Sequence, residues 1–129
     1  MSEVLVPNSH LDQLIRKCTP LGRDERAKVL EEDAELEAAY TAVATRGDSA
    51  VPESAEDEVD FHYVCFVKSQ KDGHLYEMDG DKNGPVDWGE LGDDDVMSEQ
   101  GRALVTEFVR RTGCDSGFSL LVLAPALSG

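Results

Sequence analysis

The sequence has few basic residues. Its 129 residues include 12 Lys plus Arg against 27 Asp plus Glu, which gives a formal net charge of −15. A charge this negative argues against binding nucleic acid through its phosphates and against docking on an anionic membrane. It favours a basic partner or divalent cations.

The sequence also lacks long apolar runs and paired cysteines. No apolar run approaches the roughly 20 residues that a membrane span needs. The N-terminal "MSEVLVPNSH" has no basic segment followed by an apolar stretch, so we expect no secretory signal. Three cysteines without metal-ligand spacing suit a reducing compartment better than a disulfide framework. We therefore expect a cytoplasmic chain with a single domain over residues 1–129.

The first part of the chain is predicted to be helical, over residues 9–44. Ser9 is a suitable N-cap for a short helix that ends near Thr19-Pro20. From Arg23 to about Ala44, apolar residues at spacings of three and four predict one long helix. Residues 45–58 are polar and acidic and contain Pro, Gly and Ser, which predicts an exposed loop.

The pattern becomes extended after residue 58. The segments 61–67 ("FHYVCFV") and 74–79 ("HLYEMD") are predicted strands, and "GPVDWGEL" suggests a short third strand. Residues 94–111 form a predicted amphipathic helix, with the acidic Asp93–Asp95 at its N-terminus. The apolar run 118–125 is typical of a central strand that is buried on both faces. This order predicts an α+β fold, with an antiparallel sheet flanked by helices.

A short stretch, "DGDKNGPVDWGE", fits a calcium-binding loop. Asp79, Asp81, Asn83, Gly84 and Glu90 match the EF-hand pattern at each required position. An EF-hand needs a helix leading into Asp79, whereas the preceding residues have strand formers on either side of Lys-Asp-Gly. That arrangement predicts a hairpin, and we expect no metal here.

The hairpin brings a histidine and an aspartate together. A four-residue loop at Ser69–Asp72 would pair Lys68 with Gly73 and place His62 directly opposite Asp79. Side chains that face each other across such a pair have Cβ atoms about 5 Å apart. A carboxylate at that distance can orient an imidazole and stabilise its cation, as nucleophilic catalysis requires of its base.

These residues resemble a known family. "VDFHYVCFV" followed by "DGHLYEMDG" is similar to the His and Asp motifs of the ubiquitin carboxyl-terminal hydrolases, cysteine proteases that cleave after the last glycine of ubiquitin. The resemblance continues into residues 9–44 and into "FSLLVLAPA", and it corresponds to the C-terminal half of the enzyme. It implies a partial papain-like fold in which His62 is the general base and Asp79 its orienting carboxylate. Residues 45–58 would be the crossover loop, and 59–129 the hairpin, helix and final core strand.

The chain also departs from the family. The family's nucleophilic cysteine lies upstream in an Asn-x-Cys-Gly-Thr-like motif, near an oxyanion-hole glutamine, and neither is found here. Cys65 is an odd number of residues from His62 and so points to the opposite face of a strand. Cys18 lies near a helix C-terminus, and Cys114 lacks a basic activator. Asp81 also replaces the basic residue that commonly follows the family's Asp-Gly.

These departures leave two classes of function open. The first is a thiol-dependent deubiquitinase fragment that is inactive by itself and requires a complementary N-terminal half. It would need no cofactor, and its partner would be the basic C-terminal tail of ubiquitin. The alternative is a non-catalytic ubiquitin-interaction module, and a lone EF-hand protein is the less favoured third interpretation.

Overall fold

The computed structural model describes residues 5–48, 62–113 and 118–124. Its contacts divide the chain into two compact units, Met1–Glu53 with Leu123–Gly129, and Ser54–Val122. Three helices belong to the first unit, and a three-stranded sheet with a fourth helix belongs to the second. The predicted α+β class is confirmed.

The helical unit begins with α1 (His10–Cys18), and Ser9 caps this helix as expected. The Ser9 hydroxyl accepts the backbone N–H of Asp12 at 3.2 Å. Leu14 is the buried apolar residue of the helix, with 5% of its surface exposed. Leu11, one turn before it, is 50% exposed, so only a narrow part of this helix is covered.

The prediction of one long helix over residues 23–44 is wrong. The segment forms α2 (Arg23–Glu31) and α3 (Ala34–Ala44), separated at Asp33. Asp33 has an extended backbone, and its carboxylate accepts the N–H of Leu36 at 2.8 Å. Aspartate competes with the helix for backbone N–H groups, and here that competition starts a new helix.

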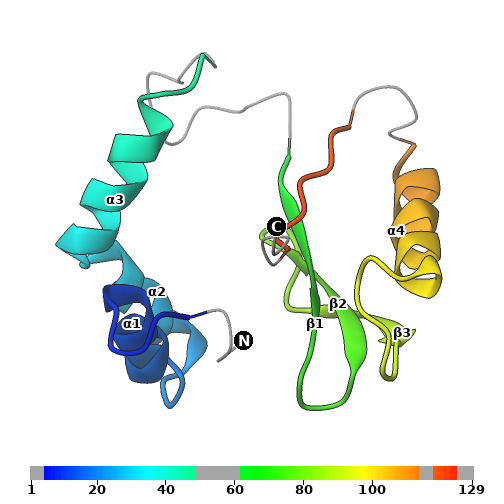
Figure 1. Cartoon of the computed structure of the whole chain (residues 1–129), viewed down its shortest axis with the longest axis horizontal. Helices are drawn as coiled ribbons and strands as arrows, with labels where there is room; N and C mark the ends of the chain where they lie inside the picture. Colours follow the sequence, from blue (N-terminus) through cyan, green and yellow to red (C-terminus); the bar gives the residue numbers. More distant parts are fainter. Residues whose placement is uncertain (1–4, 49–61, 114–117, 125–129) are drawn as a thin grey trace, which may run out of the picture. The chain divides into compact units, whose positions relative to one another are not determined.

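The hairpin and the third strand are confirmed. Strands β1 (Val64–Lys68), β2 (His74–Asp79) and β3 (Val86–Glu90) form an antiparallel sheet in the order β1-β2-β3 (Figure 1). Asp79 therefore ends a strand instead of following a helix. The helix–loop–helix of an EF-hand is not formed, and Glu90, which would complete the calcium cage, is paired across the sheet with His74.

The predicted register of the hairpin is wrong by two residues. Val64, not His62, lies opposite Asp79, and Ser69 closes the turn by donating its N–H to the carbonyl of His74 at 2.9 Å. The cause is Gly73, whose φ of +73° makes it the last residue of the turn instead of the first residue of the strand. Because the shift is even, each side chain keeps its predicted face.

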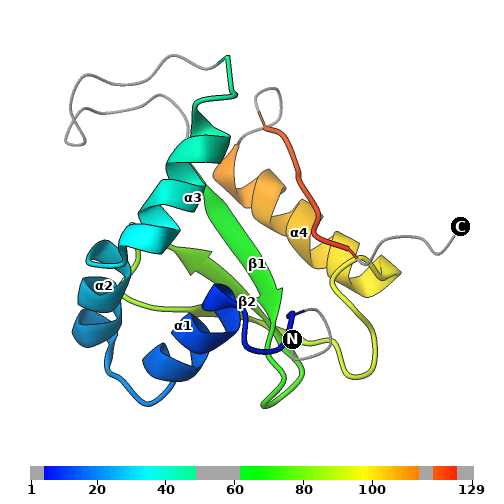
Figure 2. The same ribbon diagram turned by 60° about the vertical axis from the view of Figure 1, so that its left-hand side comes forward.

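Helix α4 (Glu99–Thr112) packs on one face of the sheet (Figures 1 and 2). The ring of Phe108 meets Phe66 of β1 and Trp88 of β3 edge-on, with ring centres 5.1 and 6.2 Å apart. Leu75 and Leu91 are the buried apolar residues of this unit. This contact defines a covered face of the sheet, which carries Phe66 and Leu75, and an opposite face.

Helix α4 begins later than predicted. Asp93–Asp95 precede the helix in a turn, where the Asp95 carboxylate accepts the N–H of Met97 at 2.7 Å. Ser98 is the N-cap, and its hydroxyl accepts the N–H of Gly101 at 3.1 Å. The acidic residues therefore lie before the helix and not in its first turn.

The strand predicted at 118–125 is also wrong for its described part. Residues 118–124 form no strand, and the side chains of Leu121 and Leu123 are 95% and 92% exposed. A strand needs a neighbour for its backbone groups, and apolar composition alone does not supply one. Most of the expected crossover loop, residues 49–58, lies outside the described residues. Within the described ranges, no helix combines the length and hydropathy required to cross a bilayer.

Candidate functional site

The structure brings His62 and Asp79 together despite the corrected register. His62 lies two residues before β1, and Asp79 is the last residue of β2. The Nε2–H of His62 donates to Oδ1 of Asp79 at 2.6 Å. The imidazole thus reaches diagonally across the open end of the hairpin, which an even register shift allows.

Asp79 is the more firmly held member of this pair. Its side chain is only 8% exposed, and its Oδ1 also accepts the backbone N–H of Asp81 at 3.0 Å. That N–H, together with the His62 hydrogen bond and the nearby charges of His62 and Lys82, keeps the pKa of the Asp79 carboxyl below its usual value. A fixed, ionised carboxylate is suited to orienting an imidazole.

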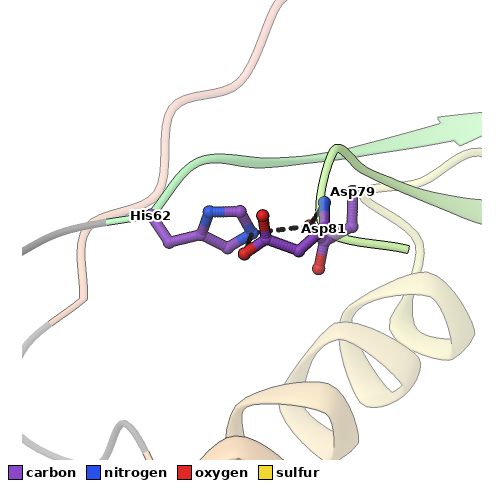
Figure 3. A group of neighbouring side chains, drawn as sticks. All are labelled: His62, Asp79 and Asp81. Atoms are coloured by element: carbon purple, nitrogen blue, oxygen red, sulfur yellow. Dashed lines mark hydrogen bonds and ion pairs between the residues drawn. The ribbon is translucent and has the colours of Figure 1, made fainter. Parts of the chain in front are cut away.

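The imidazole of His62 is half-exposed and is easier to protonate than usual. The hydrogen bond to Asp79 is the main cause of its raised pKa, and the charges of Asp79 and Asp81 add to the effect. Oδ2 of Asp81 lies 3.6 Å from Nε2, too far for a hydrogen bond. Figure 3 shows both carboxylates turned toward the same ring nitrogen. Nδ1 is left on the other side of the ring, and no described residue hydrogen-bonds to it.

Glu77 is a buried residue on the covered face whose contacts the sequence did not reveal. Its side chain is fully buried between Trp88, whose indole N–H donates to Oε1 at 3.0 Å, and Lys82, whose Nζ lies 2.7 Å from Oε2. The contact with Lys82 is an ion pair without hydrogen-bond angles. Strand alternation and the pairing of Phe66 with Glu77 place Glu77 on the same face as His62. The packing of Trp88 over it depends on α4 and could not be read from the hairpin.

Within the unit that holds His62, the described cysteine lies on the other face of the sheet. Cys65 pairs with Met78 and alternates with Phe66, so it lies on the face of the sheet opposite the covered face, where it is exposed. Cys18 is half-buried in α1, in the other unit of the chain. Cys114 lies outside the described residues.

A second histidine–carboxylate pair provides a useful comparison. His74 donates from Nδ1 to Asp87 at 2.9 Å, and its pKa is also raised, mainly by this hydrogen bond. Strand alternation places His74 on the face opposite the covered face. Its neighbour Tyr76 donates to Asp72 at 2.6 Å, which raises the pKa of the Tyr76 phenol to about 12.

The sequence of the chain matches a known family. The family model of ubiquitin carboxyl-terminal hydrolase, family 1, matches residues 2–110. The chain is 33% identical over 118 residues to ubiquitin carboxyl-terminal hydrolase isozyme L1 of Sus scrofa, covering 92% of this chain and 50% of the relative. It is 34% identical over 115 residues to the isozyme L1 of Monodelphis domestica, covering 89% and 48%.

The chain belongs to the ubiquitin carboxyl-terminal hydrolase family. It spans about half the length of the curated relatives it matches.

Proposed function

We propose that this chain supplies the general base and its orienting carboxylate to a ubiquitin carboxyl-terminal hydrolase site. His62 acts as the general base, and Asp79 orients it. The nucleophilic cysteine and the oxyanion-hole glutamine come from residues outside this sequence. The 129 residues alone therefore do not hydrolyse ubiquitin adducts.

The observation that carries this proposal is that Nε2 of His62 is hydrogen-bonded to Asp79, whereas Nδ1 has no hydrogen bond to any described residue. A carboxylate only accepts hydrogen bonds when ionised, so the contact with Asp79 fixes the hydrogen of a neutral imidazole on Nε2. Nδ1 then has a free lone pair. It can take the proton of a thiol and later return it to the leaving amine, while Asp79 stabilises the intermediate imidazolium.

The cysteines of the chain do not replace the missing nucleophile in this proposal. A thiol must lie within hydrogen-bond reach of its base, and Cys65 is on the wrong face of the sheet. The excess of 27 acidic over 12 basic residues suits the basic C-terminal tail of ubiquitin as the bound partner.

A complementation assay with a fluorogenic ubiquitin ester tests the proposal. The chain alone is expected to show no turnover. Turnover is expected to appear when the chain is co-refolded with the N-terminal half of an isozyme L1 relative, which supplies the Asn-x-Cys-Gly-Thr-like motif. His62→Gln should then lower kcat by about 10²–10⁴-fold, the usual contribution of a general base.

His74→Gln is the matched control, because it removes a histidine that is also hydrogen-bonded to an aspartate but lies on the opposite face of the sheet. It should leave kcat unchanged. Hydrolysis by the isolated chain that disappears on Cys114→Ala would refute the missing-nucleophile part of the proposal. Equal rates for His62→Gln and the unmodified complex would refute the role of the base.

A further inference from the structure

The three histidines of the chain all contact carboxylates, but their geometries differ. At His10, the carboxylates of Asp33 and Glu35 bind opposite ring nitrogens, Nε2 and Nδ1, at 2.8 and 2.9 Å. At His74, both oxygens of a single residue, Asp87, face Nδ1. Only at His62, among the described residues, do carboxylates of two residues converge on one nitrogen.

We propose that His62, Asp79 and Asp81 form a site for a divalent cation of the Zn²⁺ class. Their ligand atoms lie within 4.8 Å of one another. In Figure 3 the two aspartates come from the end of β2 and the turn after it, and the imidazole enters from the segment before β1. Imidazole nitrogen and carboxylate oxygen are both zinc ligands, and a zinc site with three protein ligands keeps a water in the fourth position.

The distances require only a small adjustment. Ligand atoms bound tetrahedrally at about 2.0–2.1 Å from zinc lie roughly 3.3 Å apart. The separation of 3.6 Å between Nε2 of His62 and Oδ2 of Asp81 is already close to this value. The 2.6 Å contact with Asp79 is a hydrogen bond, so the cation has to replace the shared hydrogen and move the two atoms apart by less than about 1 Å.

The exposure of the three side chains and the charge of the chain suit this exchange. Asp79 is 8% exposed and provides a fixed ligand, whereas His62 and Asp81 are 49% and 83% exposed and can turn toward a cation. The net charge of −15 raises the local concentration of cations. The imidazole favours zinc over calcium and magnesium, which prefer oxygen ligands throughout.

Cation binding would change the tautomer of His62. The hydrogen leaves Nε2 for solvent as the cation takes its place, and the neutral ring gains a hydrogen at Nδ1. A ring that carries hydrogen on Nδ1 cannot accept a proton there. The cation would therefore inactivate His62 as a general base. This consequence rests on the proposed function.

Calorimetric titration of ZnCl₂ into the full 129-residue chain tests the site without ubiquitin or turnover. Cys18→Ser, Cys65→Ser and Cys114→Ser should be combined as the background, so that thiols do not contribute. We expect one saturable zinc per chain and a change in the ¹⁵N shift of Nε2 of His62. Asp81→Asn and His62→Gln should each weaken zinc binding by about tenfold or more. Loss of a residue that only supports a metal ligand already costs about this much affinity, and loss of a ligand itself should cost no less.

His74→Gln and Asp87→Asn are the matched controls and should keep full affinity. The proposal is wrong if zinc does not saturate, or if Asp81→Asn binds as tightly as the background chain. It is equally wrong if Ca²⁺ binds more tightly than Zn²⁺ and that binding is lost on Glu90→Gln. Because the readout is binding, a failed hydrolysis assay leaves this test unaffected.

Discussion

His62 makes its strongest contact through Nε2, and this contact links the protonation of one side chain to the stability of the hairpin. The pKa of its imidazole is raised from 6.5, mainly by the hydrogen bond to Asp79. The pKa of the Asp79 carboxyl is lowered from 3.8. Both groups are therefore charged together over a wider range of pH in the folded chain than in the unfolded chain.

Replacing Asp79 by Asn should destabilise the chain most at mildly acidic pH. A raised imidazole pKa gives stabilisation that is complete below 6.5 and is lost as the pH rises through the folded pKa. The lowered carboxyl pKa gives stabilisation that is present above 3.8 and is lost as the pH falls further. Urea unfolding should therefore show a larger effect of Asp79→Asn near pH 5.5 than near pH 9, together with an NMR titration midpoint of His62 that moves down toward 6.5.

Asp87→Asn serves as the control for this experiment. It should lower the midpoint of His74, whose main hydrogen-bond partner it removes, and leave that of His62 in place. A midpoint for His62 at or below 6.5 in the unmodified chain would contradict the predicted coupling.

The proximity of His62 and Asp79 could be predicted because it depends only on whether the two side chains lie on the same face of the hairpin. The sequence predicts the hairpin from strand formers on either side of Lys-Asp-Gly, and any even register keeps His62 and Asp79 on one face. The register itself depends on whether Gly73 ends the turn or begins the strand, which its positive φ decides. The convergence of Asp81 on the same nitrogen depends on the turn after β2, so the spacing of the residues alone did not predict it.

At the scale of the element, helix α4 contains a glycine, Gly101, and the backbone atoms around it explain why a larger residue would not fit there. A Cβ on Gly101 would lie 2.9 Å from the carbonyl oxygen of Asp95 and still closer to that of Val96. Real Cβ atoms do not approach backbone atoms this closely. The turn before the helix therefore folds back on the first turn of α4 at a point where only glycine fits.

Gly101→Ala should destabilise the chain, although alanine is the better helix former. In an open helical position this substitution stabilises by up to about 1 kcal/mol. Here the backbone of Val96 has to move, and we expect a lower Tm by circular dichroism. Gly84→Ala is the control, because nothing lies within 4 Å of its added Cβ. A Tm for Gly101→Ala at or above that of the unmodified chain would show that the turn does not pack as described.

The boundaries of the elements were harder to predict than their existence. Asp33 and Ser98 decide where α3 and α4 begin, since each side chain accepts a backbone N–H three residues later. Aspartate and serine also occur at other positions that begin no described helix. Periodicity identifies the apolar stripe of a helix, but it does not show which of several polar residues starts a new one.

At the scale of the whole molecule, two opposing features control solubility. The apolar side chains of residues 118–123 are largely exposed, among them Phe118, Leu120 and Leu121 at 57%, 57% and 95%. Exposed apolar patches promote association. The net charge of −15 opposes it by repulsion between chains. Which of the two dominates depends on the ionic strength.

Added salt should therefore cause the chain to associate. The Debye length falls from about 30 Å at 0.01 M salt to about 8 Å at 0.15 M, which weakens the repulsion while the apolar segment remains exposed. Light scattering should show a higher mean mass at the higher salt concentration. Leu121→Lys should reduce this increase without lowering the Tm, because the side chain is 95% exposed. Val6→Lys makes the same change of charge at another exposed position and should not prevent association. A monodisperse monomer at both salt concentrations would contradict this prediction and would show that the segment is covered in solution.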